Sequence, residues 1–113
     1  MRLKSELWVK AYLRRAAVAG APGVVVRRGD TDAGAIMIRI ARLNGHCDLY
    51  GPAPAGMTSD DGERRWTLLA ENVSEATMSE RLEAEARLDP DMWIVEIEDR
   101  QGRPHLEGWL TEP

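Results

Sequence analysis

Apolar side chains recur at helical spacing near the start of the chain and predict an amphipathic helix over 7–19. At about 100° per residue, one apolar arc forms the expected core face; it holds Trp8, Val9, Tyr12, Leu13 and Ala16. Ser5 is the expected N-cap, and Gly20 and Pro22 end the helix. A second, narrow arc with basic borders is available to the sheet edge or to a partner; it holds Leu7, Ala11 and Val18.

Runs rich in Val and Ile follow this helix and predict strands. Segments 23–28 and 35–42 are separated by the turn-forming stretch 29–34, which favours an antiparallel pair. Asn44-Gly45 is the residue pair preferred in a type I′ turn, so a third strand is expected over 46–50.

The second half of the chain alternates loops, a helix and strands. Residues 51–64 are rich in Gly, Pro, Ser and Asp and predict a long loop that is either mobile or used in binding. A strand is expected over 65–70, and Ser74 caps a helix that runs to about Arg87. A strand over 92–99 and a last edge segment over 105–110 complete the series.

This order predicts one α+β domain over 1–113, with an antiparallel sheet of about five strands and two helices packed on one face. The 43% hydrophobic and 30% charged residues are typical of globular chains. The longest uncharged stretch, 16–26, is too short to cross a membrane, so no membrane partner is expected. Cys47 is the only cysteine, which excludes an internal disulfide and favours the cytoplasm.

Charge is distributed unevenly along the chain. Residues 1–45 carry nine Lys or Arg against three acids, a net of +6, whereas residues 46–113 carry six against sixteen, a net of −10. The asymmetry fits either pairing within the sheet or an electrostatic contact with a partner. The basic candidates for such a contact are Lys10, Arg14, Arg15, Arg27 and Arg28. A nucleic acid backbone is a possible ligand but is not favoured, because the chain has no Phe and only two Tyr for base stacking.

Acidic residues offer a weaker alternative. Metal-assisted hydrolysis would need several of them to converge, and the candidates are Asp30, Asp32, Glu96, Glu98 and Asp99. Their spacing matches no metal motif, and Glu96 and Glu98 are expected to pair with Arg39 or Arg27 across the sheet, so no metal and no cofactor are predicted.

Motifs for catalysis are not found in the sequence. His46 and Cys47 are adjacent and would point to opposite faces of a strand, which leaves Cys47 as a core residue. His105 is expected at the surface. No serine-nucleophile or phosphate-loop motif occurs, so the sequence assigns no catalytic residue and favours a protein that is not an enzyme.

Four segments together resemble a known family. They are Leu3-Lys4-Ser5-Glu6-Leu7-Trp8-Val9 through Tyr12-Leu13-Arg14-Arg15; Val25-Val26-Arg27-Arg28-Gly29-Asp30 with Asp32-Ala33-Gly34-Ala35; Leu49-Tyr50-Gly51-Pro52-Ala53-Pro54; and 89–100, with its run Trp93-Ile94-Val95-Glu96-Ile97-Glu98-Asp99-Arg100. In this order they resemble the short bacterial proteins of the domain of unknown function fourteen-ninety-one. The resemblance implies a free-standing cytoplasmic protein and brings no activity or site residue.

The function expected from the sequence is a small non-enzymatic protein-interaction module, with an unknown protein partner or self-association. Its candidate binding residues are Lys10, Arg14, Arg15, Arg27, Arg28, Asp30 and Asp32. Nucleic-acid backbone binding by the basic half and metal-assisted hydrolysis by the acids remain the alternatives.

Overall fold

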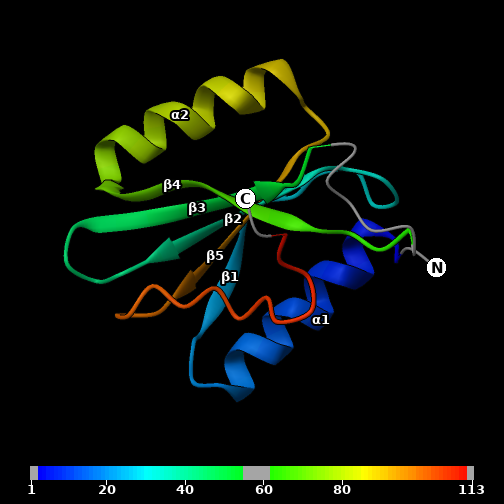
Figure 1. Ribbon diagram of the computed structural model, residues 1–113. Coiled ribbons are helices and arrows are strands. Elements are labelled where there is room, and N and C mark those ends of the chain that lie inside the picture. The colour runs from blue at the N-terminus through cyan, green and yellow to red at the C-terminus, as the bar shows by residue number, and fades with distance from the viewer. Residues whose placement is uncertain (1–2, 55–61, 112–113) are drawn as a thin grey trace.

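The computed structural model describes residues 3–54 and 62–111. The elements in chain order are α1 (Ser5–Val18), β1 (Gly23–Arg27), β2 (Ile36–Ala41), β3 (His46–Pro52), β4 (Trp66–Ser74), α2 (Glu75–Leu88) and β5 (Trp93–Glu98). The strands form one five-stranded sheet in the order β1-β5-β2-β3-β4 (Figure 1). The chain is therefore an α+β protein, as its sequence predicted.

The sheet is mixed, so the prediction of a purely antiparallel sheet is wrong. β1 and β2 are not neighbours, because β5 lies between them, antiparallel to β1 and parallel to β2. The linker 28–35 is long enough to pass over the start of β5, and the Asp30 amide donates to the Asp91 carbonyl at 2.9 Å. Gly29 and Gly34 both lie so close to that carbonyl that a Cβ on either would collide with it. The predicted hairpin from β2 to β3 is confirmed.

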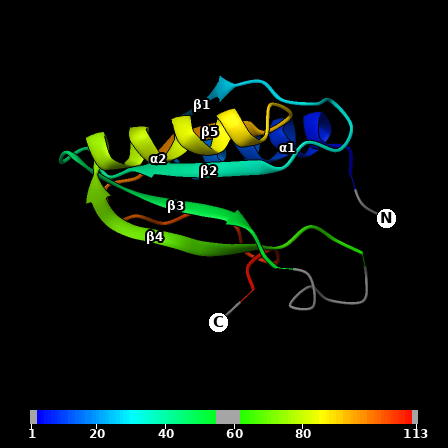
Figure 2. The same cartoon turned by 90° about the horizontal axis from the view of Figure 1, so that it is seen from above.

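The two helices cover opposite faces of the sheet, which corrects the prediction that both pack on one face. Figure 1 shows α2 above the sheet and α1 below it, and Figure 2, seen from above, shows α2 in front of the strands and α1 behind them. Alternation along the central strands explains the difference: Ile38 packs in the cluster under α1, whereas Met37 packs in the cluster under α2. A strand buried on both faces needs a cover on each side.

The larger core lies between α1 and the sheet. The predicted core arc of α1 is confirmed, since Trp8 is 2% exposed and Tyr12 is fully buried. Trp8 stacks on Trp66 with ring centroids 4.0 Å apart, and the Trp66 indole donates to the Ile36 carbonyl at 2.9 Å. Trp109, from the C-terminal segment, closes this aromatic cluster 4.9 Å from Trp8.

The smaller core lies under α2. Met78 and Leu82 are buried at 1% and 4% exposure, and Ala86 packs at the margin, so the helix packs on the sheet through every fourth residue. Ser74 is the N-cap, as predicted: its hydroxyl oxygen accepts from the Thr77 amide at 3.2 Å.

Ser5 is not the cap of α1, contrary to the prediction. It lies inside the helix and is buried, and its hydroxyl donates to the Gly34 carbonyl at 2.6 Å. The linker between β1 and β2 supplies the partners of the first helix amides instead. The backbone amides of Ser5 and Glu6 donate to the carbonyls of Asp32 and Thr31.

The last segment differs from the predicted edge strand over 105–110. Only a single parallel bridge, between Trp66 and Leu110, joins it to the sheet. His105 has a φ of 56°, which interrupts extended structure, and Leu106 is fully buried against the larger core. In the predicted loop over 51–64, residues 55–61 lie outside the described part of the chain; β3 continues to Pro52 and β4 begins at Trp66. No helix within the described residues is long and apolar enough to span a bilayer.

Candidate functional site

The outer edge of the sheet at β1 carries an exposed apolar surface. Three consecutive valines are exposed there: Val24 at 58%, Val25 at 43% and Val26 at 56%. β1 is the last strand of the sheet on this side, so its outer edge has no neighbouring strand in the described part of the chain. An exposed, apolar strand edge is the usual template for pairing with another extended chain.

The backbone register shows which groups of β1 face outward. The Pro22 carbonyl accepts from the Glu98 amide at 2.9 Å, and Val24 is opposite Glu96. Hydrogen-bonded and non-hydrogen-bonded pairs alternate along an antiparallel ladder, so Pro22 and Val24 face β5. The amide and carbonyl groups of Gly23 and Val25 therefore point away from the sheet. The register shifts between Val25 and Arg27, so the regular edge ends there.

A groove runs between β1 and α2 on the α2 face. Its volume is about 260 Å³. Apolar and polar residues of β1, β2, β5 and α2 line it; they are Val26, Leu82, Ala86 and Ile94 together with Arg27, Arg39, Ser79 and Glu83. Arg39 is held by Glu96, with 3.1 Å between Nε and Oε1, which confirms the predicted cross-strand pair. A chain added to β1 would place alternate side chains in or beside this groove.

The predicted basic residues lie in two places, and most are engaged within the fold. Lys10 and Arg28 both pair with Glu6, and the Lys10 distance is 3.2 Å. Together these cations lower the pKa of the Glu6 carboxyl, the hydrogen bond from Lys10 having the largest effect. Arg15 lies over the Trp109 ring and donates to the Glu107 carbonyl at 2.9 Å. Arg14 is exposed on α1.

Arg27 is the basic candidate that belongs to β1. Its Nη2 donates to the Pro90 carbonyl at 2.9 Å, which holds the side chain at the end of the strand. Arg27 and Arg28 thus lie at the end of β1, and Arg28 meets Lys10 of α1 at the shared Glu6 carboxylate. Arg14 and Arg15 lie farther along α1.

The acidic candidates do not come together. Asp30 lies beside Asp91, before β5 begins, whereas Asp99 follows the end of that strand. The Asp30 carboxylate accepts from the amides of Asp32 and Ala33, at 3.2 and 2.9 Å, as a local turn does. Asp32 lies 3.8 Å from Lys4. Within residues 3–54 and 62–111 no three His, Cys, Asp or Glu side chains gather in a way that could hold a metal ion.

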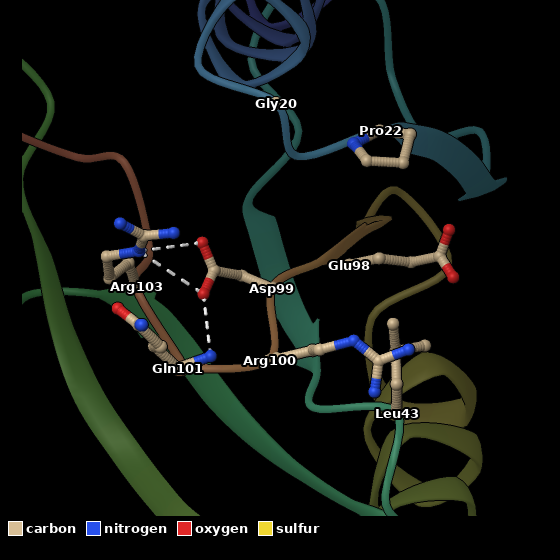
Figure 3. Close-up of a pocket in the computed structure, with 8 residues that line it drawn as sticks. All are labelled: Gly20, Pro22, Leu43, Glu98, Asp99, Arg100, Gln101 and Arg103. Atoms are coloured by element: carbon tan, nitrogen blue, oxygen red, sulfur yellow. Dashed lines mark hydrogen bonds and ion pairs between the residues drawn. The ribbon is translucent and has the colours of Figure 1, made fainter.

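A polar pocket of about 350 Å³ lies where β5 ends. Figure 3 shows Asp99 pointing toward Gln101 and Arg103, while Glu98 points away on the other side of the strand. The Asp99 carboxylate accepts from the Gln101 amide at 2.8 Å and from Arg103 Nε at 3.1 Å. Burial would raise the pKa of Asp99, but these hydrogen bonds and one from His105 outweigh it and lower that pKa.

His105 is buried, which overturns its predicted surface position. Its ring Nε2 lies 2.9 Å from the Asp99 carboxylate. Gly102, in the turn between Asp99 and His105, packs against the ion pair in which Arg42 donates to Asp48 at 2.8 Å. The hydrogen bonds of the Asp99 carboxylate go to Gln101, Arg103 and His105, and its backbone amide donates to the Ala41 carbonyl of β2 at 2.9 Å. The arrangement therefore anchors the chain after β5.

Cys47, the sole cysteine, is a buried core residue, as predicted. Burial raises the pKa of its thiol, which keeps it protonated and unreactive. Burial likewise raises the pKa of Tyr12, whose hydroxyl donates to the Pro104 carbonyl at 2.7 Å.

The sequence did not single out the valines of β1. Their run was predicted only as a strand paired antiparallel with 35–42. Three adjacent valines carry no alternation to show an exposed face. The available signal was the flanking residues: Pro22 before the run and Arg27-Arg28 after it are typical of an edge strand.

The fold and surface define an α+β protein with a mixed sheet between two helices. The chain belongs to the family described as protein of unknown function (DUF1491), whose model matches residues 3–107. The resemblance inferred from the sequence is thereby confirmed. A comparison with curated proteins finds no match.

Solved structures of similar proteins share the fold. The crystal structure of a DUF1491 family protein from Caulobacter crescentus CB15 is 35% identical, with a TM-score of 0.80 and coverage of 99% of this chain and 100% of that one. A solution structure of a protein from A. tumefaciens is 41% identical, with a TM-score of 0.77 and coverage of 88% and 87%. An NMR structure of a DUF1491 family protein from C. crescentus CB15 is 39% identical, with a TM-score of 0.78 and coverage of 99% of both chains.

Proposed function

We propose that this protein is a non-enzymatic protein-interaction module of the cytoplasm that binds another polypeptide along the outer edge of β1. The observation that carries the proposal is the exposure of Val24, Val25 and Val26 on a strand edge that has outward-facing backbone groups. Main-chain hydrogen bonds to that edge would supply affinity, and the groove beside α2 would select side chains.

The basic residues give less support to nucleic-acid binding. Lys10 and Arg28 share the carboxylate of Glu6, and Arg15 is occupied by Glu107 and Trp109. A phosphate backbone would have to compete with these internal partners, which reduces the gain from each contact.

Affinity capture of the tagged full chain from lysate of its own source tests the proposal. Val25→Pro removes the outward amide, and Val25→Lys places a charge on the edge. Val18→Lys is the matched control, because Val18 is 83% exposed but lies at the end of α1 and contributes no backbone group to the strand edge. We expect a polypeptide that survives nuclease treatment and is lost with both Val25 variants but kept with Val18→Lys. Equal capture by all four proteins, or loss on nuclease treatment alone, would contradict the edge as the binding site.

A further inference from the structure

The two ends of β1 carry opposite charge. At its beginning, Glu96 and Glu98 of the neighbouring strand line a small hollow of about 110 Å³ together with Pro22, Gly23 and Val24. At its end, Arg27 is followed by Arg28. Ile94 of β5 packs in the core under α2, so alternation along β5 puts Glu96 and Glu98 on the same face of the sheet. Arg27 is opposite Ile94 and therefore lies on this α2 face as well.

This charge arrangement is self-complementary. We propose that the occupant of the β1 edge is a second copy of this chain, paired antiparallel through β1, so that one sheet continues across both copies. This inference rests on the proposed function and names the partner for that site. In an antiparallel pair the end of one strand lies beside the beginning of the other, which brings Arg27 of each copy toward Glu98 of the other, while Glu96 stays paired with Arg39.

The symmetry of such a pair keeps the charges on one surface. A two-fold axis perpendicular to the sheet relates the copies, so the α2 face of one is continuous with the α2 face of the other. A parallel arrangement would instead bring the arginine ends together, which repulsion opposes. The complementary contact occurs twice, once at each end of the paired strands.

The backbone of β1 fits the same arrangement. Gly23 and Val25 present their amide and carbonyl groups outward, and these can bond to Val25 and Gly23 of the second copy. The exposed valines of each copy would then cover those of the other, removing apolar surface from water. The register shift after Val25 limits the pairing to this short stretch of β1. Because the contact uses the same edge in both copies, no edge is left for a third copy and the assembly closes as a dimer.

The mass of the full chain in solution, measured by light scattering over a concentration series, tests the dimer. We expect twice the 12.6 kDa of one chain at high concentration. Val25→Pro and Val25→Lys should each give a monomer whose amide NMR signals change only in β1 and its surroundings, whereas Val18→Lys should dimerise as the parent does. If Val25→Pro disturbs the fold, Val25→Lys decides. A monomeric parent at millimolar concentration, or dimeric Val25 variants, would overturn the proposal.

Charge exchange tests the antiparallel direction. Glu98→Lys and Arg27→Glu should each weaken dimerisation at least about tenfold, because each places like charges together. The double variant should recover most of the affinity, since the exchanged charges are again complementary across the interface. No recovery in the double variant would exclude this pairing.

The outcomes also separate this inference from the proposed function. A parent that is monomeric but loses a captured polypeptide on Val25→Pro keeps β1 as a binding edge and excludes a second copy as its partner. A parent whose dimer and captured polypeptides both survive Val25→Pro excludes both.

Discussion

Nε2 of His105 lies 2.9 Å from the carboxylate of Asp99, with both side chains buried. An ionised carboxylate only accepts hydrogen bonds, so the imidazole donates. The bond closes the turn that follows β5 and directs the next residue, Leu106, into the larger core, where it is fully buried. This pair therefore connects the polar end of the sheet to the aromatic cluster on the α1 face.

Replacing Asp99 by Asn is expected to destabilise the protein by about 1–3 kcal/mol, because hydrogen bonds to a buried charge are lost while the shape is kept. Urea denaturation followed by tryptophan fluorescence measures the change. Asp91→Asn is the matched control, since Asp91 is exposed. Equal stability of the two variants would show that the Asp99 carboxylate contributes nothing to the fold.

Acid should reduce the stability that Asp99 provides. Its pKa in the folded protein is lower than its ordinary value of 3.8. The folded state therefore binds this proton less readily than the unfolded state, and the stabilisation is complete above the ordinary pKa and is lost as the pH falls through the lower folded value. The stability difference between the parent and Asp99→Asn should shrink as the pH falls below about 4. A difference that is constant from neutral to acid pH would contradict a lowered pKa.

Two glycines in left-handed conformations should respond differently to a methyl group. Gly102 has a φ of 73°, and a Cβ there would lie 2.6 Å from Arg42 Nη2 and 2.8 Å from Asp48 Oδ2. Gly45 has a φ of 87° and no atom within 4 Å of the same position. Gly45→Ala should cost about 1–2 kcal/mol for the backbone alone. Gly102→Ala should cost clearly more in thermal or urea unfolding, because it also displaces the partly buried ion pair of Arg42 and Asp48. Equal costs would mean that this pair moves aside freely.

Local elements were predictable from the sequence, and their neighbours in the sheet were not. The core stripe of α1, the Ser74 cap and the β2–β3 hairpin depend on residues close together in the chain. The insertion of β5 between β1 and β2 depends on a contact across about sixty residues, which no local spacing encodes. The same limit applies to Ser5, which has a capping sequence but bonds to Gly34, 29 residues away. His105 is a different case, because its partner Asp99 is only six residues away and it is the turn between them that buries the ring.

The candidate site was predictable only in part. Arg27 and Arg28 were predictable from their charge, and both lie at the end of the exposed edge. The valines before them were not, because exposure of an apolar strand depends on whether another strand covers its edge and face. That is a property of the whole sheet, which here places β1 outermost.

The packing of α2 on the sheet predicts that two leucines of this helix contribute very differently to the stability of the protein. Leu82 is 4% exposed and packs with Met37, Leu49 and Ile94, whereas Leu88, at the end of the same helix, is 87% exposed. Leu82→Ala should cost about 2–5 kcal/mol, since it opens a cavity between the helix and the sheet. Leu88→Ala should change stability by no more than about 0.5 kcal/mol. Urea unfolding of both variants measures the contrast. Similar values would show that Leu82 does not pack between α2 and the sheet.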